Sequence, residues 1–258
     1  MRIGIFDSGV GGLSIWQAVR GRLPHSSLVY LADQAYCPYG ERNPAWIRDR
    51  SHRITEYLIQ EYGCSLIVIA CNTATSAAIH HLRDIFDIPF VGVEPAIKPA
   101  ALQTKTGKVG VLATAGTLTG GHFLQTSERY ASGVEVIVQI GHGLVEWVES
   151  GDMEDEDGKA LLQSYLQPMM ETSVDQLVLG CTHYPFLATA IEEITQGSLQ
   201  IHEPSAAIAT RVKELWAKGD SPEREELFLT TGEERSYERL VADLLGIGEI
   251  PSKSIQLS

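Results

Sequence analysis

Short unbroken apolar runs alternate with longer amphipathic stretches along this chain. The runs Ile3–Phe6, Leu28–Leu31 and Leu66–Ala70 are rich in Ile, Leu and Val, which is typical of strands buried on both faces. The stretches from about Leu13 to Leu23 and from about Trp46 to Tyr62 place apolar residues near helical spacing. Strands that alternate with helices predict an α/β fold with parallel sheets and right-handed crossovers.

The same strand pattern occurs a second time. Val109–Leu112 repeats Ile3–Phe6 at a distance of 106 residues, and Leu177–Gly180 repeats Leu66–Ala70. Four matched elements indicate an internal duplication. We therefore expect two similar parallel-sheet α/β domains, related by pseudo-two-fold symmetry, with the active site in the cleft between them. The two remaining pairs are Leu28–Leu31 with Val134–Ile140, and Ile88–Val93 with Leu199–His202.

The tail that follows the second copy is expected to cross back onto the first half of the chain. We assign residues 1–97 and 207–258 to a first, discontinuous α/β domain and residues 98–206 to a second. The tail is predicted to contain a helix of about Ser205–Lys218, a polar loop at Gly219–Glu226, a strand at Leu227–Thr230 and a helix of about Arg235–Leu245.

Two matched strands end in a cysteine that is followed by polar residues. Cys71-Asn72-Thr73 follows one strand and Cys181-Thr182-His183 follows its copy, 110 residues further along. Each thiol lies where a strand passes into a helix, which is the edge of a parallel sheet that binds ligands. Helix N-terminal amides favour anions and can lower the pKa of a thiol toward neutrality.

Two equivalent thiols that face one pocket suit the inversion of a stereocentre. One thiolate removes a proton from one face of a carbon, and the other thiol returns a proton to the opposite face. Asp7, just past the first strand, and His183 are candidates to assist the thiols. The alternative to a catalytic pair is that both cysteines are buried and chemically inert. A lone cysteine nucleophile with His183 as its base leaves Cys71 unexplained, and a zinc site is disfavoured because no CxxC pair is present.

Composition narrows the range of functions. The formal net charge of −13 over 258 residues argues against partners such as nucleic acid or an anionic membrane surface. Apolar runs fall well short of the ~20 residues that a membrane helix needs. No signal peptide is recognised before Ile3, and the chain has four cysteines, so we expect reduced thiols and a cytoplasmic location. Two of the cysteines, Cys37 and Cys64, are expected to be a spectator and a small buried residue.

Several segments together resemble the glutamate racemases of the cofactor-independent aspartate/glutamate racemase superfamily. The resemblance spans nearly the whole chain, and the paired Cys-Asn-Thr and Cys-Thr-His motifs are its most specific part. The matching segments are Ile5-Phe6-Asp7-Ser8-Gly9-Val10-Gly11-Gly12-Leu13, Cys37-Pro38-Tyr39-Gly40, Ala70-Cys71-Asn72-Thr73-Ala74-Thr75, Leu179-Gly180-Cys181-Thr182-His183-Tyr184-Pro185 and Phe228-Leu229-Thr230-Thr231-Gly232.

The resemblance implies interconversion of L- and D-glutamate, which supplies D-glutamate for bacterial peptidoglycan. It implies no cofactor, neither pyridoxal phosphate nor a metal, and a homodimer. Cys71 and Cys181 would be the proton donor and acceptor, assisted by Asp7, His183 and Glu149. The residues implied to hold the substrate are Asp7, Ser8, Tyr39, Gly40, Asn72, Thr73, Thr114, Thr117 and Thr182.

One departure loosens the assignment of the acidic helper. Many relatives carry Cys-Pro before the segment that contains Glu149, and here Gly141-His142 stands in that place, so Glu146 is a rival one helical turn earlier. Two other functions stay open. One is a racemase for aspartate or another amino acid, and the other is a non-catalytic two-lobed protein that binds a dicarboxylate.

Overall fold

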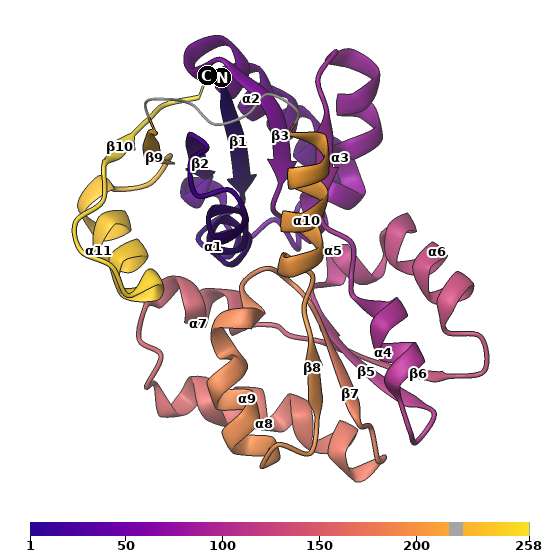
Figure 1. Cartoon of the computed structure of the whole chain (residues 1–258). Helices are drawn as coiled ribbons and strands as arrows, with labels where there is room; N and C mark the ends of the chain where they lie inside the picture. Colours follow the sequence, from indigo (N-terminus) through magenta and orange to yellow (C-terminus); the bar gives the residue numbers. More distant parts are fainter. Residues whose placement is uncertain (217–223, 258) are drawn as a thin grey trace.

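The protein folds into two lobes, each built on its own parallel sheet (Figure 1). The computed structural model describes residues 1–216 and 224–257. Within these residues the first sheet has six strands in the order β10-β9-β2-β1-β3-β4, and the second has four in the order β6-β5-β7-β8. The strands are β1 Arg2–Asp7, β2 Leu28–Ala32, β3 Cys64–Ile69, β4 Phe90–Gly92, β5 Lys108–Ala113, β6 Glu135–Ile140, β7 Gln176–Gly180, β8 Gln200–His202, β9 Glu226–Thr230 and β10 Ser252–Ser254.

The strand order confirms the duplication that the sequence predicts. In each half the second strand lies beside the first, the third lies on the other side of the first, and the fourth follows the third. Because strands of both halves run parallel, their carboxyl ends collect at one edge of each sheet. The polar residues that follow β1, β3, β5 and β7 therefore gather where the two lobes meet.

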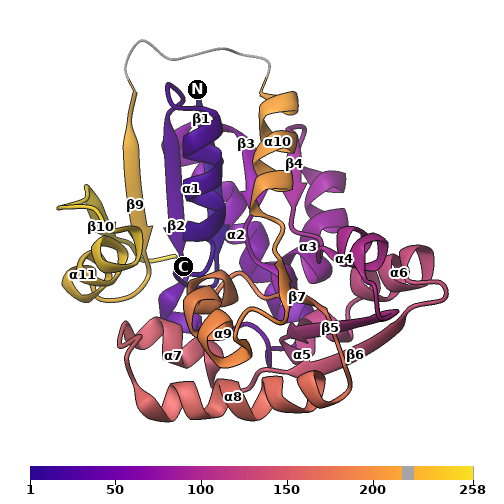
Figure 2. The same ribbon diagram turned by 60° about the horizontal axis from the view of Figure 1, so that its bottom comes forward.

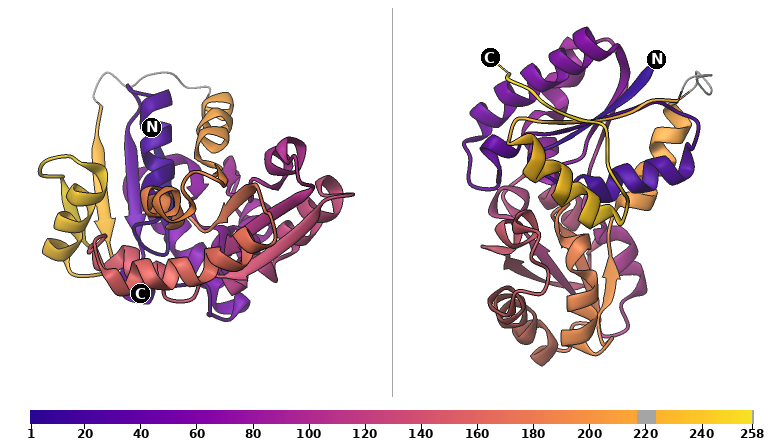
Figure 3. Two further views of the ribbon diagram at one scale, coloured as in Figure 1. Left: turned by 90° about the horizontal axis from the view of Figure 1, so that it is seen from below. Right: turned by 90° about the vertical axis from the view of Figure 1, so that its left-hand side faces the viewer.

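Helices cover both faces of the first sheet (Figure 3). α2 and α3 pack on one face, while α1, α10 and α11 lie on the other. None of the helices in the described part of the chain is long and apolar enough to span a membrane. The helices are α1 Leu13–Arg22, α2 Pro44–Tyr62, α3 Asn72–Ile85, α4 Ile97–Gln103, α5 Ala115–Leu118, α6 Gly121–Tyr130, α7 Leu144–Ser150, α8 Glu156–Glu171, α9 Ala188–Thr195, α10 Ser205–Leu215 and α11 Glu234–Leu245, with short 3₁₀ turns η1 at Gln34–Tyr36 and η2 at Tyr184–Leu187.

Local sequence signals explain where the long helix α2 begins and ends. The side chain of Asn43 accepts a hydrogen bond from the backbone of Ala45 and so caps the N-terminus, with Pro44 at the first helical position. Gly63 ends the helix in the left-handed conformation with φ of 63°, which a glycine adopts without strain. Between these ends, Ile47, Ile54 and Leu58 line the buried face.

One apolar core runs from the first lobe into the second. It joins Ile5 and Leu13 of the first lobe to Leu144, Leu162 and Leu177 of the second. Two smaller cores fill the outer layers, one beneath α2 and α3 and one between the second sheet and helices α4 and α6. The lobes therefore share buried apolar surface and do not merely touch through polar loops.

The tail that follows β8 packs on the first lobe. α10 packs against α1, and β9 pairs with β2 along its whole length, placing Leu229 beside Leu31 (Figure 2). The short strand β10, which pairs with β9, has no predicted counterpart because it lacks an apolar run. The end of the predicted helix Ser205–Lys218 and most of the predicted loop Gly219–Glu226 lie outside the described residues.

A buried ion pair fixes the loop that follows β2. Asp33 is fully buried, and its carboxylate accepts two hydrogen bonds from Arg50 of α2, at 2.6 Å from Nη2 and 2.8 Å from Nε. The same carboxylate accepts hydrogen bonds from the hydroxyls of Tyr39 and Thr231. Four donors around one buried charge hold α2, the loop and the end of β9 in one arrangement.

Replacing Arg50 by methionine should destabilise the protein strongly. The change leaves the carboxylate of Asp33 buried without its cation, so we expect the free energy of unfolding to fall by about 3–5 kcal/mol. Urea unfolding measures this. Arg53→Met is the matched control, because Arg53 lies on the same helix and pairs with Asp49 at the exposed surface. Its loss should cost less than about 1 kcal/mol. Equal losses in the two variants would contradict the role given to Asp33.

Candidate active site

A small cavity of about 10 Å³ lies between the two lobes, at the carboxyl ends of their strands. That volume holds about one water molecule, so the walls are nearly in contact and a larger ligand needs the lobes to part. Its walls include both thiols of the duplicated motifs. The residues that were predicted from sequence and line this cavity are Ser8, Tyr39, Gly40, Cys71, Asn72, Thr73, Thr114, Thr117, Cys181, Thr182 and His183.

A larger cavity lies where the chain crosses between the lobes. It measures about 470 Å³ and is lined by Glu94, Pro95, Glu203 and Pro204 among others. It contains no thiol and no histidine. Size alone would favour this cavity, but the groups that can move protons converge on the smaller one. We therefore take the smaller cavity, called the thiol cavity below, as the active site.

Cys71 lies at the end of β3 and caps helix α3. Its Sγ accepts a hydrogen bond from the backbone of Ala74 at 3.4 Å and lies 4.0 Å from the Ser8 hydroxyl. Burial raises the pKa of the Cys71 thiol well above its ordinary value, and the nearby negative charge of Asp7 raises it further. The expectation that the helix N-terminus lowers this pKa is therefore wrong, because removal from water outweighs one helix amide.

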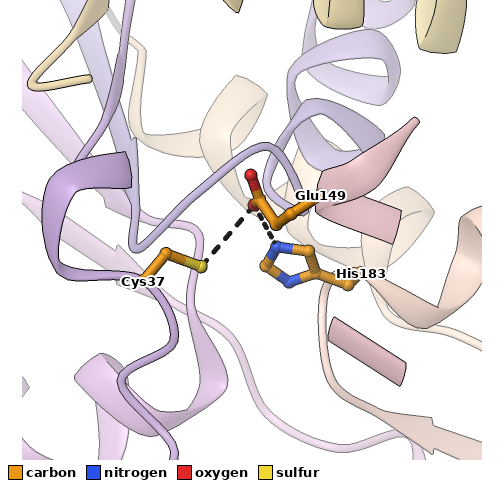
Figure 4. Close-up of side chains that lie close together, drawn as sticks. All are labelled: Cys37, Glu149 and His183. Carbon is orange, nitrogen blue, oxygen red and sulfur yellow. Dashed lines mark hydrogen bonds and ion pairs between the residues drawn. The ribbon is translucent and has the colours of Figure 1, made fainter. Parts of the chain in front are cut away.

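Cys181 ends β7 and faces an imidazole that can take its proton. Its Sγ lies 3.7 Å from Nδ1 of His183. Figure 4 shows the other side of that ring, where Nε2 lies 2.7 Å from Oε1 of Glu149. In either protonation state Nε2 donates to the carboxylate; Nδ1 donates toward the sulfur in the imidazolium and accepts from the thiol in the neutral ring. The backbone amide of Gly11, 3.3 Å from Nε2, is then a packing contact, because this nitrogen already carries its proton.

Glu149 and His183 shift each other's pKa in opposite directions. Burial alone would raise the pKa of Glu149, but hydrogen bonds and the charge of His183 bring that pKa below its ordinary value. Burial alone would lower the pKa of His183, but Cys181, Cys37 and Glu149 as partners raise it well above the ordinary value. The pair is therefore held as a carboxylate and an imidazolium over a wide range of pH. Glu146, the rival acidic helper, is exposed and one turn away from this contact.

Asp7 lies behind the thiol cavity and does not line it. Its carboxylate accepts hydrogen bonds from the backbone amides of Ser8 and Gly12, both at 2.7 Å, and from the hydroxyl of Thr182 at 3.3 Å. Burial nevertheless raises the pKa of Asp7. Asp7 is thus a buried acid beside Cys71, and it links the first lobe to the loop that carries Cys181.

The glycine-rich turn after β1 lets the second lobe approach closely. A Cβ atom on Gly9 would lie 1.8 Å from Oε1 of Glu149, and one on Gly11 would lie 2.3 Å from Nδ1 of His183. Between them, the backbone amide of Val10 donates a hydrogen bond to Oε1 of Glu149 at 2.7 Å. Glycine is needed at these positions because the side chains of the other lobe fill the space that a Cβ would take.

The polar walls of the thiol cavity include an unpaired amide and a chain of hydroxyls. Asn72 is buried, and neither its Oδ1 nor its Nδ2 has a hydrogen-bond partner among the described residues. The hydroxyl of Thr114, in the second lobe, lies 3.0 Å from the hydroxyl of Thr73 in the first lobe and 3.0 Å from that of Thr117. The hydroxyl of Tyr39 points to Asp33, so this residue forms a wall and does not offer its hydroxyl to a ligand.

Two side chains of the site have no role in the sequence-based prediction. Cys37, expected to be a spectator, places its Sγ 3.6 Å from Oε1 of Glu149 and 4.0 Å from the Ser8 hydroxyl (Figure 4). Burial raises the pKa of the Cys37 thiol to about 12. Gln34 donates a hydrogen bond from Nε2 to Oε2 of Glu149 at 3.0 Å. The only signal for both was their place in the loop after β2, at the ligand edge of the sheet.

Cys37, Glu149 and His183 form a group of residue types that can ligate a metal ion. Two ligands of a tetrahedral zinc ion, each bonded at about 2.0–2.1 Å, keep roughly 3.3 Å between them. Oε1 of Glu149 and Nε2 of His183 are only 2.7 Å apart, which is a hydrogen-bond distance. This spacing suits a shared proton better than a shared ion.

Comparison with known proteins agrees with the geometry. The sequence model of Asp/Glu/Hydantoin racemases matches residues 14–212. The chain belongs to this racemase family. Glutamate racemase of Stutzerimonas stutzeri is 42% identical to it over 251 residues, which cover 95% of this chain and 94% of that protein.

Solved structures of the racemase family share the whole fold. Glutamate racemase isoform RacE1 from Bacillus anthracis superposes with a TM-score of 0.87 at 29% identity, covering 99% of this chain and 97% of that one. Escherichia coli glutamate racemase, solved in complex with L-glutamate and the activator UDP-MurNAc-Ala, has a TM-score of 0.86 at 30% identity and covers 99% of both chains. The two-lobed arrangement is therefore that of the family.

Adding a methyl group at Gly11 should cost stability. The Cβ of Gly11→Ala overlaps the ring of His183, which can move only by disturbing Glu149, so we expect a loss of about 1–3 kcal/mol in the free energy of unfolding. The control is Gly21→Ala, on helix α1, where a Cβ meets no atom within 4 Å. That change should leave stability the same or raise it by about 0.5–1 kcal/mol. A Gly11→Ala variant as stable as the parent would refute the close contact.

The pair of Glu149 and His183 predicts a window of pH in which it stabilises the fold. The lowered pKa of Glu149 contributes stability that is complete above 4.5 and is lost as pH falls through the folded-state pKa. The raised pKa of His183 contributes stability that is complete below 6.5 and is lost as pH rises through its folded-state pKa. Urea unfolding should therefore show the largest difference between the parent and Glu149→Gln between pH 4.5 and 6.5.

The exposed neighbour Glu146 provides the control for this measurement. Glu146→Gln removes a carboxylate from the same helix without touching His183, so its effect on stability should be small at every pH. If Glu149→Gln likewise changes stability by the same amount in acid, neutral and alkaline buffers, the ion pair does not form.

Proposed function

We propose that this protein is a glutamate racemase that interconverts L- and D-glutamate through the thiols of Cys71 and Cys181. The observation that carries the proposal is that both thiols line one small cavity together with the unpaired amide of Asn72. A buried amide without a partner is costly unless a ligand satisfies it. The matched relative from S. stutzeri and the structural neighbours support glutamate as the substrate.

In the proposed reaction the two thiols exchange one proton with the α-carbon. The thiolate of one cysteine removes the α-proton and becomes a thiol, which leaves a carbanion on the substrate. The thiol of the other cysteine then protonates the opposite face and becomes a thiolate. The product is the other enantiomer, and the reverse reaction uses the same groups with their roles exchanged. No oxidant or reductant is needed, because only protons move.

Each thiol has its own proton partner in this scheme. His183, backed by Glu149, takes or returns the proton of Cys181, and Asp7 does so for Cys71. A thiol whose pKa is raised is a strong base once ionised, which suits the weakly acidic α-proton. The positive ammonium group of a bound amino acid favours the thiolate and thereby offsets the cost of ionising a buried sulfur.

The polar residues that line the thiol cavity are proposed to hold the substrate. Ser8, Asn72, Thr73 and Thr182 offer hydroxyl and amide groups that can bind the two carboxylates and the ammonium group of glutamate. Gly40, Thr114 and Thr117 line the same cavity. Tyr39 contributes packing in place of a hydrogen bond. An aspartate racemase would use the same thiols, and a screen of amino acids separates the two.

We extend the proposal to the organisation of the chain and its role. The chain passes from the first sheet to the second after β4 and returns after β8, where β9 pairs with β2. This supports a division into residues 1–97 with 207–258 and residues 98–206. Production of D-glutamate for peptidoglycan and a homodimer follow from the family resemblance, and gel filtration with light scattering tests the dimer. The four cysteines are free, and two of them must stay as thiols, which fits a reducing compartment such as the cytoplasm.

Replacing either thiol by a hydroxyl should abolish racemisation. A serine hydroxyl is far less acidic than a thiol, so Cys71→Ser and Cys181→Ser should each lower the rate by about 10²- to 10⁴-fold. Circular dichroism follows the inversion of either enantiomer, and in heavy water the parent should place deuterium at the α-carbon. Cys64→Ala, which removes a buried thiol outside the cavity, is the control and should remain active. Both serine variants racemising glutamate at the parent rate would overturn the mechanism.

A further inference from the structure

The segment Thr230-Thr231-Gly232 at the end of β9 holds the start of the loop after β2. The hydroxyl of Thr231 donates to Asp33 and accepts from the backbone of Ala35 at 3.1 Å. The hydroxyl of Thr230, which is fully buried, accepts a hydrogen bond from the backbone of Gly232 at 2.9 Å. It therefore directs its own hydrogen to Oε1 of Gln34, 3.0 Å away. Thr230 thus holds the side chain of Gln34, and Thr231 holds the backbone of the next residue, Ala35.

This arrangement decides which way the amide of Gln34 points. Because Oε1 of Gln34 accepts from Thr230, its Nε2 must face the other direction, where it donates to Oε2 of Glu149 at 3.0 Å. The reversed amide would set its oxygen against the carboxylate, which is repulsive. Gly232 lets Gln34 lie close, since a Cβ there would meet Gln34 at 3.1 Å. The amide is therefore a fixed donor, aimed from the first lobe at the second.

The two oxygens of Glu149 then have separate partners. Oε1 contacts His183 and accepts from the backbone of Val10, while Oε2 accepts from Gln34. A carboxylate held at both oxygens cannot rotate, so the oxygen that faces the imidazole stays in place. The imidazole in turn keeps Nδ1 toward Cys181 at 3.7 Å. A continuous chain of contacts thus runs from Thr230 through Gln34, Glu149 and His183 to one of the two thiols.

We propose that Gln34 is a positioning residue that acts through Glu149 and His183 on Cys181, and that Thr230 sets its orientation. The inference rests on the proposed racemase function and deepens it. It assigns to one thiol a proton relay that crosses between the lobes and exists only when they are closed. Cys71 is supported differently, by the buried acid Asp7, which is held by backbone amides of the first lobe and by the hydroxyl of Thr182. The two thiols therefore have unequal support.

Gln34→Met tests the proposal by removing the amide while keeping the length of the side chain. Losing a hydrogen bond to a charged group should lower kcat/KM for glutamate by about 10- to 100-fold. Thr230→Val, which removes the orienting hydroxyl, should have a smaller effect of the same kind, and Thr230→Ser should restore most of what Thr230→Val loses. Gln167→Met is the matched control, since Gln167 donates to Glu171 at 2.9 Å on the exposed face of α8.

An isotope experiment distinguishes positioning from general loosening of the fold. With each enantiomer deuterated at the α-carbon in turn, Gln34→Met should change the primary isotope effect unequally, because only the proton transfer at Cys181 is slowed. A structural defect that spares this relay would slow both transfers and keep the two effects alike. Thermal unfolding of each variant shows whether it is folded before rates are compared.

A second readout does not depend on activity. Carbon-13 NMR of the labelled Glu149 carboxyl should show its pKa raised in Gln34→Met and unchanged in Gln167→Met, because a donor to the anion has been lost. The titratable groups around this carboxyl are His183, Cys37, Tyr30 and Tyr237, and all four remain in every variant.

The outcomes separate the two proposals. If the parent protein does not racemise glutamate, the proposed function fails, and the NMR titration alone decides whether Gln34 supports Glu149. If the parent is active but Gln34→Met keeps kcat/KM within twofold, equal isotope effects and an unchanged Glu149 pKa, the role of Gln34 is wrong. A lowered kcat/KM with unequal isotope effects and a raised Glu149 pKa supports it.

Discussion

One carboxylate joins the chemistry of the second lobe to the backbone of the first. Glu149 lies 2.7 Å from the imidazole of His183 and accepts the backbone amide of Val10 at the same distance. An ionised group at this depth is tolerated only because donors surround it. The glycines on either side of Val10 are needed so that the two lobes can come this close. The site is therefore a product of lobe closure and not of either lobe alone.

Burial has the largest effect on the electrostatics of the cavity. It raises the pKa of Asp7, Cys37 and Cys71, whereas the close contact of Glu149 with His183 reverses its effect on both members of that pair. At rest the first thiol is thus neutral and strongly basic when ionised. A positive group placed beside the sulfur would favour its ionisation by Coulomb attraction.

The sequence predicts what depends on local pattern. Apolar runs that end in Cys71 and Cys181 mark two strand ends, and in a parallel sheet such ends share one edge, so the pattern places both thiols at one cavity. Wall residues such as Thr114 and Thr117 are implied only by the family resemblance. The pKa of Cys71 was predicted in the wrong direction, since its burial depends on how the lobes close. Gln34 and Cys37 could not be assigned roles, because these depend on contacts with Thr230 and Glu149, which are more than one hundred residues away in sequence.

The apolar core that continues through both lobes limits how the molecule can open. Leu144 and Leu177 of one lobe belong to the same buried cluster as Ile5 and Leu13 of the other, so pulling the lobes straight apart would expose that surface to water. A rotation that keeps the core closed and parts only the polar rim costs far less. We therefore expect substrate to enter, and product to leave, through a hinge motion of the lobes about the shared apolar core.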